Sequence, residues 1–298
     1  MSDQAVRIGL IGLGAMGAGM GANILEKTGA LHICANRTRT VADKLIHAGA
    51  VEHQSPRDLA KSCDVIVLCL PNSDIVETTL ETMRPALTPG KIVIDTGTSS
   101  LTSLEAIDAD LTAMGVGFAE SPLTGGAAQA EAGTLGALVG ASSEVFERIT
   151  PTLSLFCSSV QRFGPVGAGA RAKFVNNYMV MGIIALVTEA FHMADLNKTD
   201  WDKLYDVVTR GSADSGALRR IIGHAKQGDF TGYRFSIGNA AKDMRYISEM
   251  AHDLDRDTPL AMAVHDFFDG AAKAGLGDKL VSQLMEPETR DRLFRTEE

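Results

Sequence analysis

The chain has 298 residues, of which 45% are hydrophobic and 22% charged, and its 28 basic and 37 acidic side chains give a formal charge of −9. This composition excludes a disordered chain, which would be poor in apolar residues, and it disfavours a nucleic-acid-binding protein, because a net anion repels phosphate unless a local basic surface compensates. The length predicts one or two domains, since a single core rarely grows beyond about 250–300 residues.

The first half of the chain alternates short apolar segments with segments of helical spacing. The predicted strands are Val6–Ile11, Leu31–Ala35, Val65–Leu70, Ile92–Asp95, Val116–Glu120, Thr134–Gly140 and Val160–Phe163. The predicted helices are Met16–Glu26, Thr40–Ala48, Asp74–Met83, Ser100–Met114 and Glu144–Phe156. Strands that alternate with helices indicate βαβ units, and therefore a parallel sheet covered on both faces.

After Gly164-Pro165 the sequence predicts helices and no further strand. A helix over about Gly169–Asp195 would be roughly 40 Å long at 1.5 Å per residue, enough to connect two domains. The fold class predicted is α/β, with a Rossmann-type, doubly wound NAD(P)-binding domain over residues 1–164. An all-helical domain that begins with the long interdomain helix is expected over residues 165–298.

A glycine-rich loop follows the first predicted strand and opens the first predicted helix. Its sequence is Gly12-Leu13-Gly14-Ala15-Met16-Gly17, a G-x-G-x-x-G pattern. The first glycine permits a tight turn, the second lets the backbone approach a pyrophosphate, and the third lets helix and strand pack closely. Because strand, loop, helix and second strand occur at the right intervals, the loop is predicted to bind a dinucleotide rather than to be a glycine turn without a ligand.

The end of the second predicted strand indicates which dinucleotide is bound. An NAD-preferring site usually has an acidic residue here for the ribose 2′-hydroxyl, but this chain has Asn36-Arg37-Thr38 followed by Arg39. A guanidinium binds a 2′-phosphate through charge-assisted hydrogen bonds. The sequence therefore favours NADP, with NAD as the alternative, and a solvated loop arginine remains a second interpretation of Arg37.

The start of the long predicted helix carries two polar residues on one face. Lys173 and Asn177 are four residues apart, and the same face continues with the apolar Met181 and Ile184. A lysine that extends along apolar surface into water explains this pattern. A lysine beside the nicotinamide explains it as well, and the residues alone leave both interpretations open.

Five segments, in order along the whole chain, make the sequence resemble the β-hydroxyacid dehydrogenase family, which includes 3-hydroxyisobutyrate dehydrogenases and tartronate semialdehyde reductases. The segments are the glycine loop, Leu70-Pro71 with Asp95-Thr96-Gly97-Thr98, Ser121-Pro122-Leu123-Thr124-Gly125-Gly126, the run from Gly164 through Lys173 to Asn177, and Lys242-Asp243. Two positions depart from the family pattern, since Thr124 and Gly97 stand where serine is usual.

The resemblance implies a role for each segment. Lys173 would be the general acid/base, Asn177 would orient the substrate, and Thr124 with the Gly125 and Gly126 amides would bind its anionic group. Leu70, Pro71 and Thr98 would line the nicotinamide ribose, and Lys242 would contact the cofactor or the substrate. The helical domain would bind substrate and form a homodimer or homotetramer.

The resemblance thus implies hydride transfer between NADP(H) and a small β-hydroxy acid or its semialdehyde. One alternative is a reductase of another small anionic aldehyde, for example a sulfonated one. A second alternative is a dinucleotide-binding protein without catalysis. Imine reductases resemble the family but usually lack the lysine, so Lys173 favours carbonyl chemistry. No metal is expected, because the seven histidines form no i, i+4 pair.

The cysteine content and the N-terminal residues bear on the compartment. Four scattered cysteines are too few for a disulfide framework, which favours a reducing compartment. Residues 1–5 contain no basic stretch, so no signal peptide is expected. The longest apolar run, Met179–Val187, is about half of what a membrane span needs. We expect a cytoplasmic protein.

Overall fold

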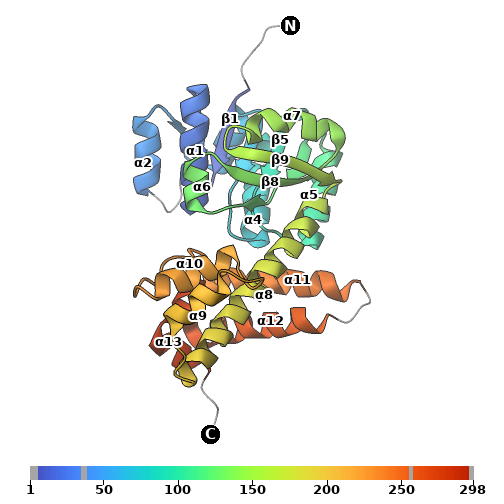
Figure 1. The fold of residues 1–298 in the computed structure, drawn as a ribbon. Coiled ribbons are helices and arrows are strands. Elements are labelled where there is room, and N and C mark those ends of the chain that lie inside the picture. Colours follow the sequence, from blue (N-terminus) through green and yellow to red (C-terminus); the bar gives the residue numbers. More distant parts are fainter. Residues whose placement is uncertain (1–5, 35–38, 255–257, 295–298) are drawn as a thin grey trace. The chain divides into compact units, whose positions relative to one another are not determined.

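The computed structural model describes residues 6–34, 39–254 and 258–294, and the chain divides into two units, residues 1–173 and 174–298 (Figure 1). The boundary predicted from the sequence is at residue 164, and the division between these units lies nine residues further on, inside the long helix α8 (Ala168–Leu196). The first residues of this helix hydrogen-bond to the end of a strand of the first unit. The first turns of the helix therefore pack with the sheet.

A nine-stranded sheet is the centre of the first unit, within the described residues. Its strands are β1 (Ile8–Ile11), β2 (His32–Cys34), β3 (Val51–Glu52), β4 (Val65–Leu68), β5 (Ile92–Asp95), β6 (Gly117–Glu120), β7 (Leu123–Thr124), β8 (Leu135–Ala141) and β9 (Cys157–Gly164). They are ordered β3-β2-β1-β4-β5-β6-β8-β7, and β9 pairs with β8. The predicted doubly wound fold class is confirmed.

Helices cover both faces of this sheet. They are α1 (Ala15–Thr28), α2 (Arg39–His47), α3 (Pro56–Ser62), α4 (Ser73–Met83), the 3₁₀ turn η1 (Arg84–Ala86), α5 (Leu101–Ala113), α6 (Ala127–Glu131) and α7 (Ser143–Leu153). Residues of α1, α2, α6 and α7 share one apolar core with alternate residues of the strands. Helices α3, α4 and α5 contact one another on the opposite face. The strands β1, β4 and β5 are buried throughout, as expected for strands covered on both faces.

The sheet is not parallel throughout, which corrects one prediction. The six strands from β3 to β6 in sheet order, β3-β2-β1-β4-β5-β6, are parallel. In contrast, β8 runs antiparallel to both β6 and β7. Only 14 residues separate β6 from β8 and they already hold β7 and α6, so the chain turns back instead of crossing over. The helix α7 then supplies a full crossover, and β9 is parallel to β8.

Side chains cap the N-termini of four helices of this unit, α3, α4, α5 and α7. Ser55, Asn72, Ser100 and Ser142 each accept a hydrogen bond from the backbone N–H of the third residue of the following helix. The short elements β3, α3, β7 and α6 were not predicted, because two to seven residues are too few to show a period.

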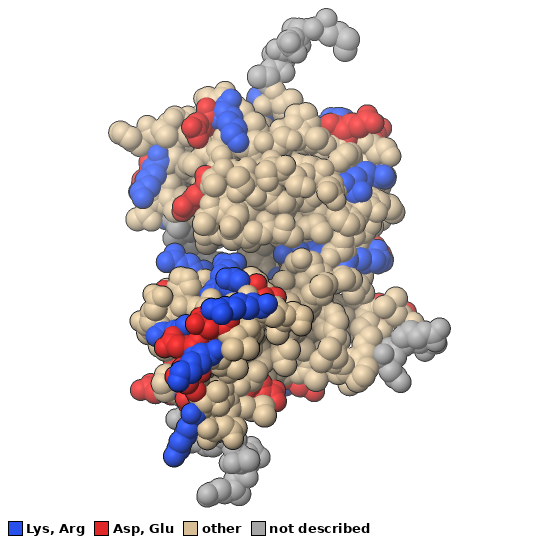
Figure 2. Space-filling view, in the orientation of Figure 1, with Lys and Arg blue, Asp and Glu red and all other residues tan. Residues whose placement is uncertain are grey.

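In its described residues, 174–254 and 258–294, the second unit is helical apart from a single bridge between Ser236 and Leu280. After α8 it contains α9 (Trp201–Val208), α10 (Gly216–Ala225), α11 (Ile237–His252), α12 (Pro259–Ala271), the π-helical η2 (Ala272–Leu276), the 3₁₀ turn η3 (Val281–Met285) and α13 (Pro287–Leu293). Its buried side chains include Phe174, Ile184, Phe191, Met244 and Phe268. On the face drawn in Figure 2, acidic and basic side chains are interspersed over this unit.

Helix α8 is the one element of the described chain that is long and apolar enough to cross a membrane by length and composition. Within its most apolar window 39% is buried in the structure. The core helix of a soluble protein passes the same test, so this property alone assigns no membrane location.

Candidate functional site

Four of the predicted site segments follow neighbouring strands at one edge of the sheet. Ile11, Leu68, Asp95 and Glu120 end β1, β4, β5 and β6, and they are paired in register across the sheet. The glycine loop, Leu70-Pro71, Gly97-Thr98 and Ser121–Gly126 come directly after these strands. The carboxyl edge of a doubly wound sheet is where such folds bind ligands.

The glycine loop has the geometry that a dinucleotide requires. Gly12 has φ of +100°, and a Cβ there would lie 2.2 Å from the carbonyl oxygen of Cys69, so only glycine fits. A Cβ on Gly17 would lie 1.9 Å from the Gly12 oxygen, whereas the space beside Gly14 is open. Helix α1 begins at Ala15, and Gly14 before it provides no side-chain cap. The loop therefore presents an open backbone and uncapped N–H groups, which fit a pyrophosphate.

The residues predicted to choose between NADP and NAD, Asn36, Arg37 and Thr38, lie outside the described residues. Their neighbour Arg39 is described, and its guanidinium pairs with Asp43 and with Glu52 of β3. These carboxylates hold Arg39 on helix α2. Arg39, which is not among the residues predicted to bind the cofactor, is thus engaged within the protein.

A buried carboxylate shapes the loop after β5. Asp95 is fully buried, and it accepts hydrogen bonds from the Gly97 amide at 2.9 Å and from the Ser99 hydroxyl at 2.6 Å. A Cβ on Gly97 would lie 2.8 Å from the Leu70 carbonyl oxygen. The predicted cofactor segments around Leu70 and Thr98 are therefore packed against each other, and glycine at position 97 permits this approach.

The predicted substrate loop lies between two strands and a short helix. Thr124 belongs to β7, and its hydroxyl donates a long hydrogen bond of 3.4 Å to Gly136 O of β8. Gly125 has φ of +106°, and the Gly126 amide donates to Gln129 Oε1 at 2.9 Å. An anion that accepts from the Gly126 amide would displace the Gln129 side chain, and no pattern in the sequence indicates this partner.

Lys173 lies at the end of the first unit, near the start of α8. Its Nζ donates to the Leu123 carbonyl oxygen at 2.7 Å. Leu123 immediately precedes Thr124, so the lysine ammonium lies beside the predicted substrate loop. The structure thus brings together Lys173 and the segment that resembles the family's anion-binding loop.

Sequence reasoning missed one further residue of the first unit, Glu120. This carboxylate is 1% exposed, and its Oε1 accepts hydrogen bonds from three backbone N–H groups at the start of α8, those of Gly167, Gly169 and Ala170. Burial raises the pKa of Glu120 to about 7, although these hydrogen bonds oppose the rise. Because its partners are about 50 residues away, no local pattern indicated them.

In the second unit, Asn177 lies in a polar cluster on the buried face of α8, with Met181 and Ile184 further along the same face. Its amide nitrogen donates to Asp243 Oδ2 at 2.6 Å, and Lys242 Nζ lies 3.2 Å from Asp243 Oδ1. Asp243 is 2% exposed. Lys242-Asp243 is one of the five segments of the family resemblance, which implies no role for Asp243. In the structure, the Asp243 carboxylate contacts both Asn177 and Lys242, the two residues predicted to belong to the site.

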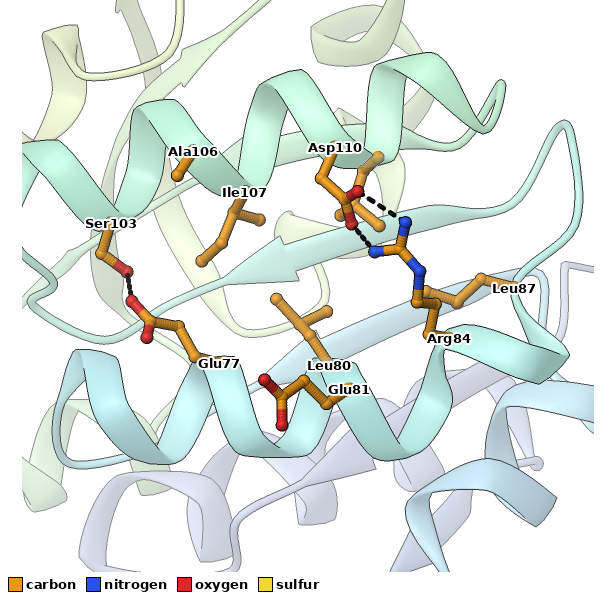
Figure 3. Close-up of a pocket in the computed structure, with 10 residues that line it drawn as sticks. Glu77, Leu80, Glu81, Arg84, Leu87, Ser103, Ala106, Ile107 and Asp110 are labelled. Carbon is orange, nitrogen blue, oxygen red and sulfur yellow. Dashed lines mark hydrogen bonds and ion pairs between the residues drawn. The ribbon is translucent and has the colours of Figure 1, made fainter.

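A cavity of about 220 Å³ lies between α4 and α5, away from all these residues (Figure 3). Apolar side chains such as Leu80 and Ile107 line it, Ser103 donates to Glu77, and Arg84 pairs with Asp110. None of the predicted site residues lines this cavity, and we assign it no role.

Comparison with known proteins covers nearly the whole chain. Residues 7–164 match the family model described as the NAD binding domain of 6-phosphogluconate dehydrogenase. Residues 167–287 match the model described as NAD-binding of NADP-dependent 3-hydroxyisobutyrate dehydrogenase. Both halves of the chain are thus similar to parts of NAD(P)-dependent dehydrogenases.

Individual relatives align over almost their full length. An L-threonate dehydrogenase of Cupriavidus necator is 30% identical over 274 residues, which is 91% of this chain and 92% of the relative. A 3-sulfolactaldehyde reductase of Escherichia coli is 29% identical, with 94% of each chain covered. The crystal structure of a Salmonella typhimurium 3-hydroxyisobutyrate dehydrogenase is 27% identical, with 95% of this chain and 99% of that chain covered and a TM-score of 0.86.

Proposed function

Because the chain belongs to the β-hydroxyacid dehydrogenase family, to which 3-hydroxyisobutyrate dehydrogenase also belongs, and is therefore an NAD(P)-dependent oxidoreductase, we propose that it transfers a hydride between NADP(H) and a small β-hydroxy acid or its semialdehyde. The observation that carries this proposal is the position of Lys173 Nζ, 2.7 Å from Leu123 O and beside the predicted anion-binding loop. A proton donor and an anion-binding segment in one place suit a substrate that carries both a carbonyl and an acid group.

The glycine loop and the segments after β4 and β5 are assigned to the cofactor. The open backbone at Gly14 and the uncapped start of α1 suit its pyrophosphate, and Leu70, Pro71 and Thr98 are assigned to the nicotinamide ribose. When bound, the nicotinamide supplies or accepts the hydride. NADP is proposed over NAD because the second strand is followed by Arg37 and by no acidic residue. The family model's description as NADP-dependent supports this choice.

Lys173 is assigned the proton transfer. An ammonium group has three N–H donors, and the donation to Leu123 O aims one of them at the backbone. With that bond holding Nζ in place, another N–H of Lys173 donates to the carbonyl oxygen of the substrate. The proton moves from Nζ to this oxygen during reduction and returns to Nζ during oxidation.

The remaining proposed roles concern the substrate's position. Thr124 offers a hydroxyl whose present hydrogen bond is long and weak, so it can donate to a carboxylate or a sulfonate together with the Gly125 and Gly126 amides. Asn177, one helical turn after Lys173, is proposed to orient the reacting group, and Asp243 fixes its amide. Lys242 is proposed to contact the cofactor or the substrate.

Replacing Lys173 with Ala tests the role of the lysine. We expect kcat to fall roughly 10²–10⁴-fold, the usual contribution of a general acid/base, while the Kd for NADPH stays unchanged, because the glycine loop is untouched. Steady-state kinetics and a fluorescence titration with NADPH measure the two quantities. A variant that keeps more than about a tenth of the rate would refute the assignment.

The substrate class is tested with a small panel. L-threonate and 3-hydroxyisobutyrate are offered with NADP⁺, and 3-sulfolactaldehyde with NADPH, following the names of the relatives. Turnover of the first two supports the hydroxy-acid proposal, and a clear preference for the sulfonated aldehyde favours the alternative. NADPH binding without turnover of any compound would favour a protein that binds the dinucleotide without catalysis.

A homodimer or a homotetramer is also proposed, because one face of α8 is apolar and exposed. Val175, Met179, Leu186 and Met193 are all more than half exposed, and at 3.6 residues per turn they fall within roughly 40° around the helix. Exposed apolar faces of this kind mark protein or membrane contacts, and a second copy presents the same face for a symmetric contact.

The protein is also proposed to be cytoplasmic, because its cysteines are free and three of them are buried, as is usual in a reducing compartment.

Leu186→Glu is expected to convert the oligomer to a monomer in sedimentation velocity. The neighbouring Glu189→Gln serves as a control on the same helix. A wild-type protein that is monomeric at micromolar concentration, or that sediments with liposomes, would overturn the proposed oligomer.

A further inference from the structure

A buried carboxylate connects the end of β6 to the start of α8. Glu120 Oε1 accepts from the backbone N–H groups of Gly167, Gly169 and Ala170 at 3.0, 2.9 and 3.2 Å. The neighbours are fitted closely around this link. A Cβ on Gly140 would lie 1.9 Å from Glu120 Oε1, and a Cβ on Gly169 would lie 2.3 Å from the Leu138 carbonyl oxygen. The carboxylate therefore occupies a site with no room for larger neighbours.

This link does more than complete the hydrogen bonds of a helix end. Four other helices of the unit, α3, α4, α5 and α7, are capped by a Ser or Asn that directly precedes them, and such a cap acts only on its own helix end. Glu120 comes from a strand 47 to 50 residues earlier in the chain. A cap of this kind fixes the position of the helix relative to the sheet, and the negative charge suits the positive end of the helix dipole.

The same short segment holds α8 at a second point. Leu123, three residues after Glu120, accepts the hydrogen bond from Lys173 Nζ, and Lys173 is three residues after Ala170. The segment from Glu120 to Thr124 thus binds the helix start through its carboxylate and the lysine through its backbone, and it carries the hydroxyl assigned to the substrate. A shift of the helix start would move Nζ relative to Thr124.

We propose that Glu120 is a positioning residue for the reaction: it holds the first turn of α8 at the end of β6 and so sets the place of Lys173 Nζ beside the substrate loop. This inference rests on the proposed function, in which Lys173 transfers the proton. A purely stabilising role is a poor explanation for this side chain, because a buried carboxylate loses its hydration. Its Oε2 has no hydrogen-bond partner among the described residues.

Three substitutions of graded chemistry test the proposal. Glu120→Gln keeps an acceptor at the same distance, Glu120→Asp shortens the side chain by one methylene, and Glu120→Ala removes the acceptor. Ser142→Ala is the matched control, because Ser142 caps α7 of the same unit through Val145 N and has no part in the proposed site. The assays use the substrate with the highest kcat/KM in the panel above.

Hydrogen–deuterium exchange of the backbone over residues 165–174 is measured on each variant, together with kcat, KM and the Kd for NADPH. Glu120→Gln is expected to stay within about threefold of the wild-type kcat. Glu120→Asp and Glu120→Ala are expected to lose about 10- to 100-fold in kcat, since small misplacements of a reacting group cost that much. Their exchange over residues 165–174 rises, and their Kd for NADPH stays unchanged. Ser142→Ala lowers the melting temperature and leaves kcat unchanged.

Each contrary result has a defined meaning. A kcat per folded molecule in Glu120→Asp and Glu120→Ala equal to that of Ser142→Ala overturns the positioning role, and so does unchanged exchange over residues 165–174. A Glu120→Gln variant as impaired as Glu120→Ala also overturns it, because the retained acceptor would then not suffice. Full activity in Lys173→Ala refutes the proposed function instead, and the exchange data remain an independent measure of the helix anchor.

Discussion

Glu120 binds a proton more tightly in the folded protein than in the unfolded chain. Its pKa rises from 4.5 to about 7 because the carboxyl is buried. The contribution of this group to stability is therefore complete below about pH 4.5, and it is lost as the pH rises through 7. Over that window the loss amounts to about 3 kcal/mol, at about 1.4 kcal/mol per pKa unit.

The melting temperatures of the wild type and of Glu120→Gln, measured from pH 5 to pH 8, test this directly. The wild type is expected to lose stability relative to Glu120→Gln as the pH rises, because glutamine does not ionise. Parallel curves for the two proteins would show that Glu120 titrates in the native state as it does in the unfolded chain.

Arg37 governs the choice of coenzyme in our proposal. A hydrogen bond to a charged group contributes about 1.5–3 kcal/mol, so NADPH is expected to be preferred over NADH by roughly 10- to 150-fold, mainly in KM. The preference should weaken with added salt, which screens the contact. Replacing Asn36 with Asp and Arg37 with Ala is expected to reverse it. Equal KM values for the two coenzymes in the wild type would contradict the NADP assignment.

Two helices of the first unit are joined by one buried amide. Asn23 of α1 donates to Gly19 O and to the carbonyl oxygens of Ala130 and Glu131 at the end of α6, each at 3.0 Å. The two helices also approach closely, since a Cβ on Gly19 would lie 2.5 Å from the Ala130 carbonyl carbon. The helix that follows the glycine loop therefore supports the short helix that follows the substrate loop, which lies beside it (Figure 1).

Replacing Asn23 with Ala is expected to cost about 1–3 kcal/mol of stability, because buried carbonyl oxygens lose their donor. Thr28→Ala is the control on the same helix, since the Thr28 hydroxyl bonds to the backbone of Ile24 and Ala30 at the end of its own helix and joins no second helix, and a smaller loss is expected there. Chemical denaturation followed by circular dichroism measures both. Equal losses would indicate that the link between α1 and α6 adds nothing specific.

The elements that could be predicted from sequence are those with enough residues to show a period. The apolar runs of β1, β4 and β5, the spacing of the longer helices and the glycine loop all follow from local sequence. The antiparallel direction of β8 was not predicted, because β7 and α6, which fill the connection from β6, are too short to be recognised. Glu120, Gln129 and Asp243 carry no local pattern. Glu120 and Asp243 are defined by partners 47 to 66 residues away, and Gln129 lies in a helix too short to be predicted.

On the scale of the whole molecule, the division inside α8 determines which N-terminal fragment is expected to be the more stable. A fragment of residues 1–164 lacks Gly167, Gly169 and Ala170, and so leaves the Glu120 carboxylate buried without its donors. A fragment of residues 1–173 retains them and is expected to have the higher melting temperature, with measurable NADPH binding. Neither fragment is expected to turn over substrate, because both lack Asn177 and Lys242. Turnover by either one would refute the roles assigned to these residues.

Strand β8 also has a consequence for biosynthesis. It pairs with β6 and β7, which the ribosome releases earlier, and with β9, which it releases later. Domains fold in order as they leave the ribosome, at about 5–20 residues per second. The strands β1 to β5 can therefore pair while the chain is still growing, but one edge of β8 stays unpaired until β9 emerges. The Glu120 carboxylate gains its N–H donors only later, when residues 167–170 have emerged. The cofactor half of the first unit can therefore form several seconds before the half assigned to chemistry.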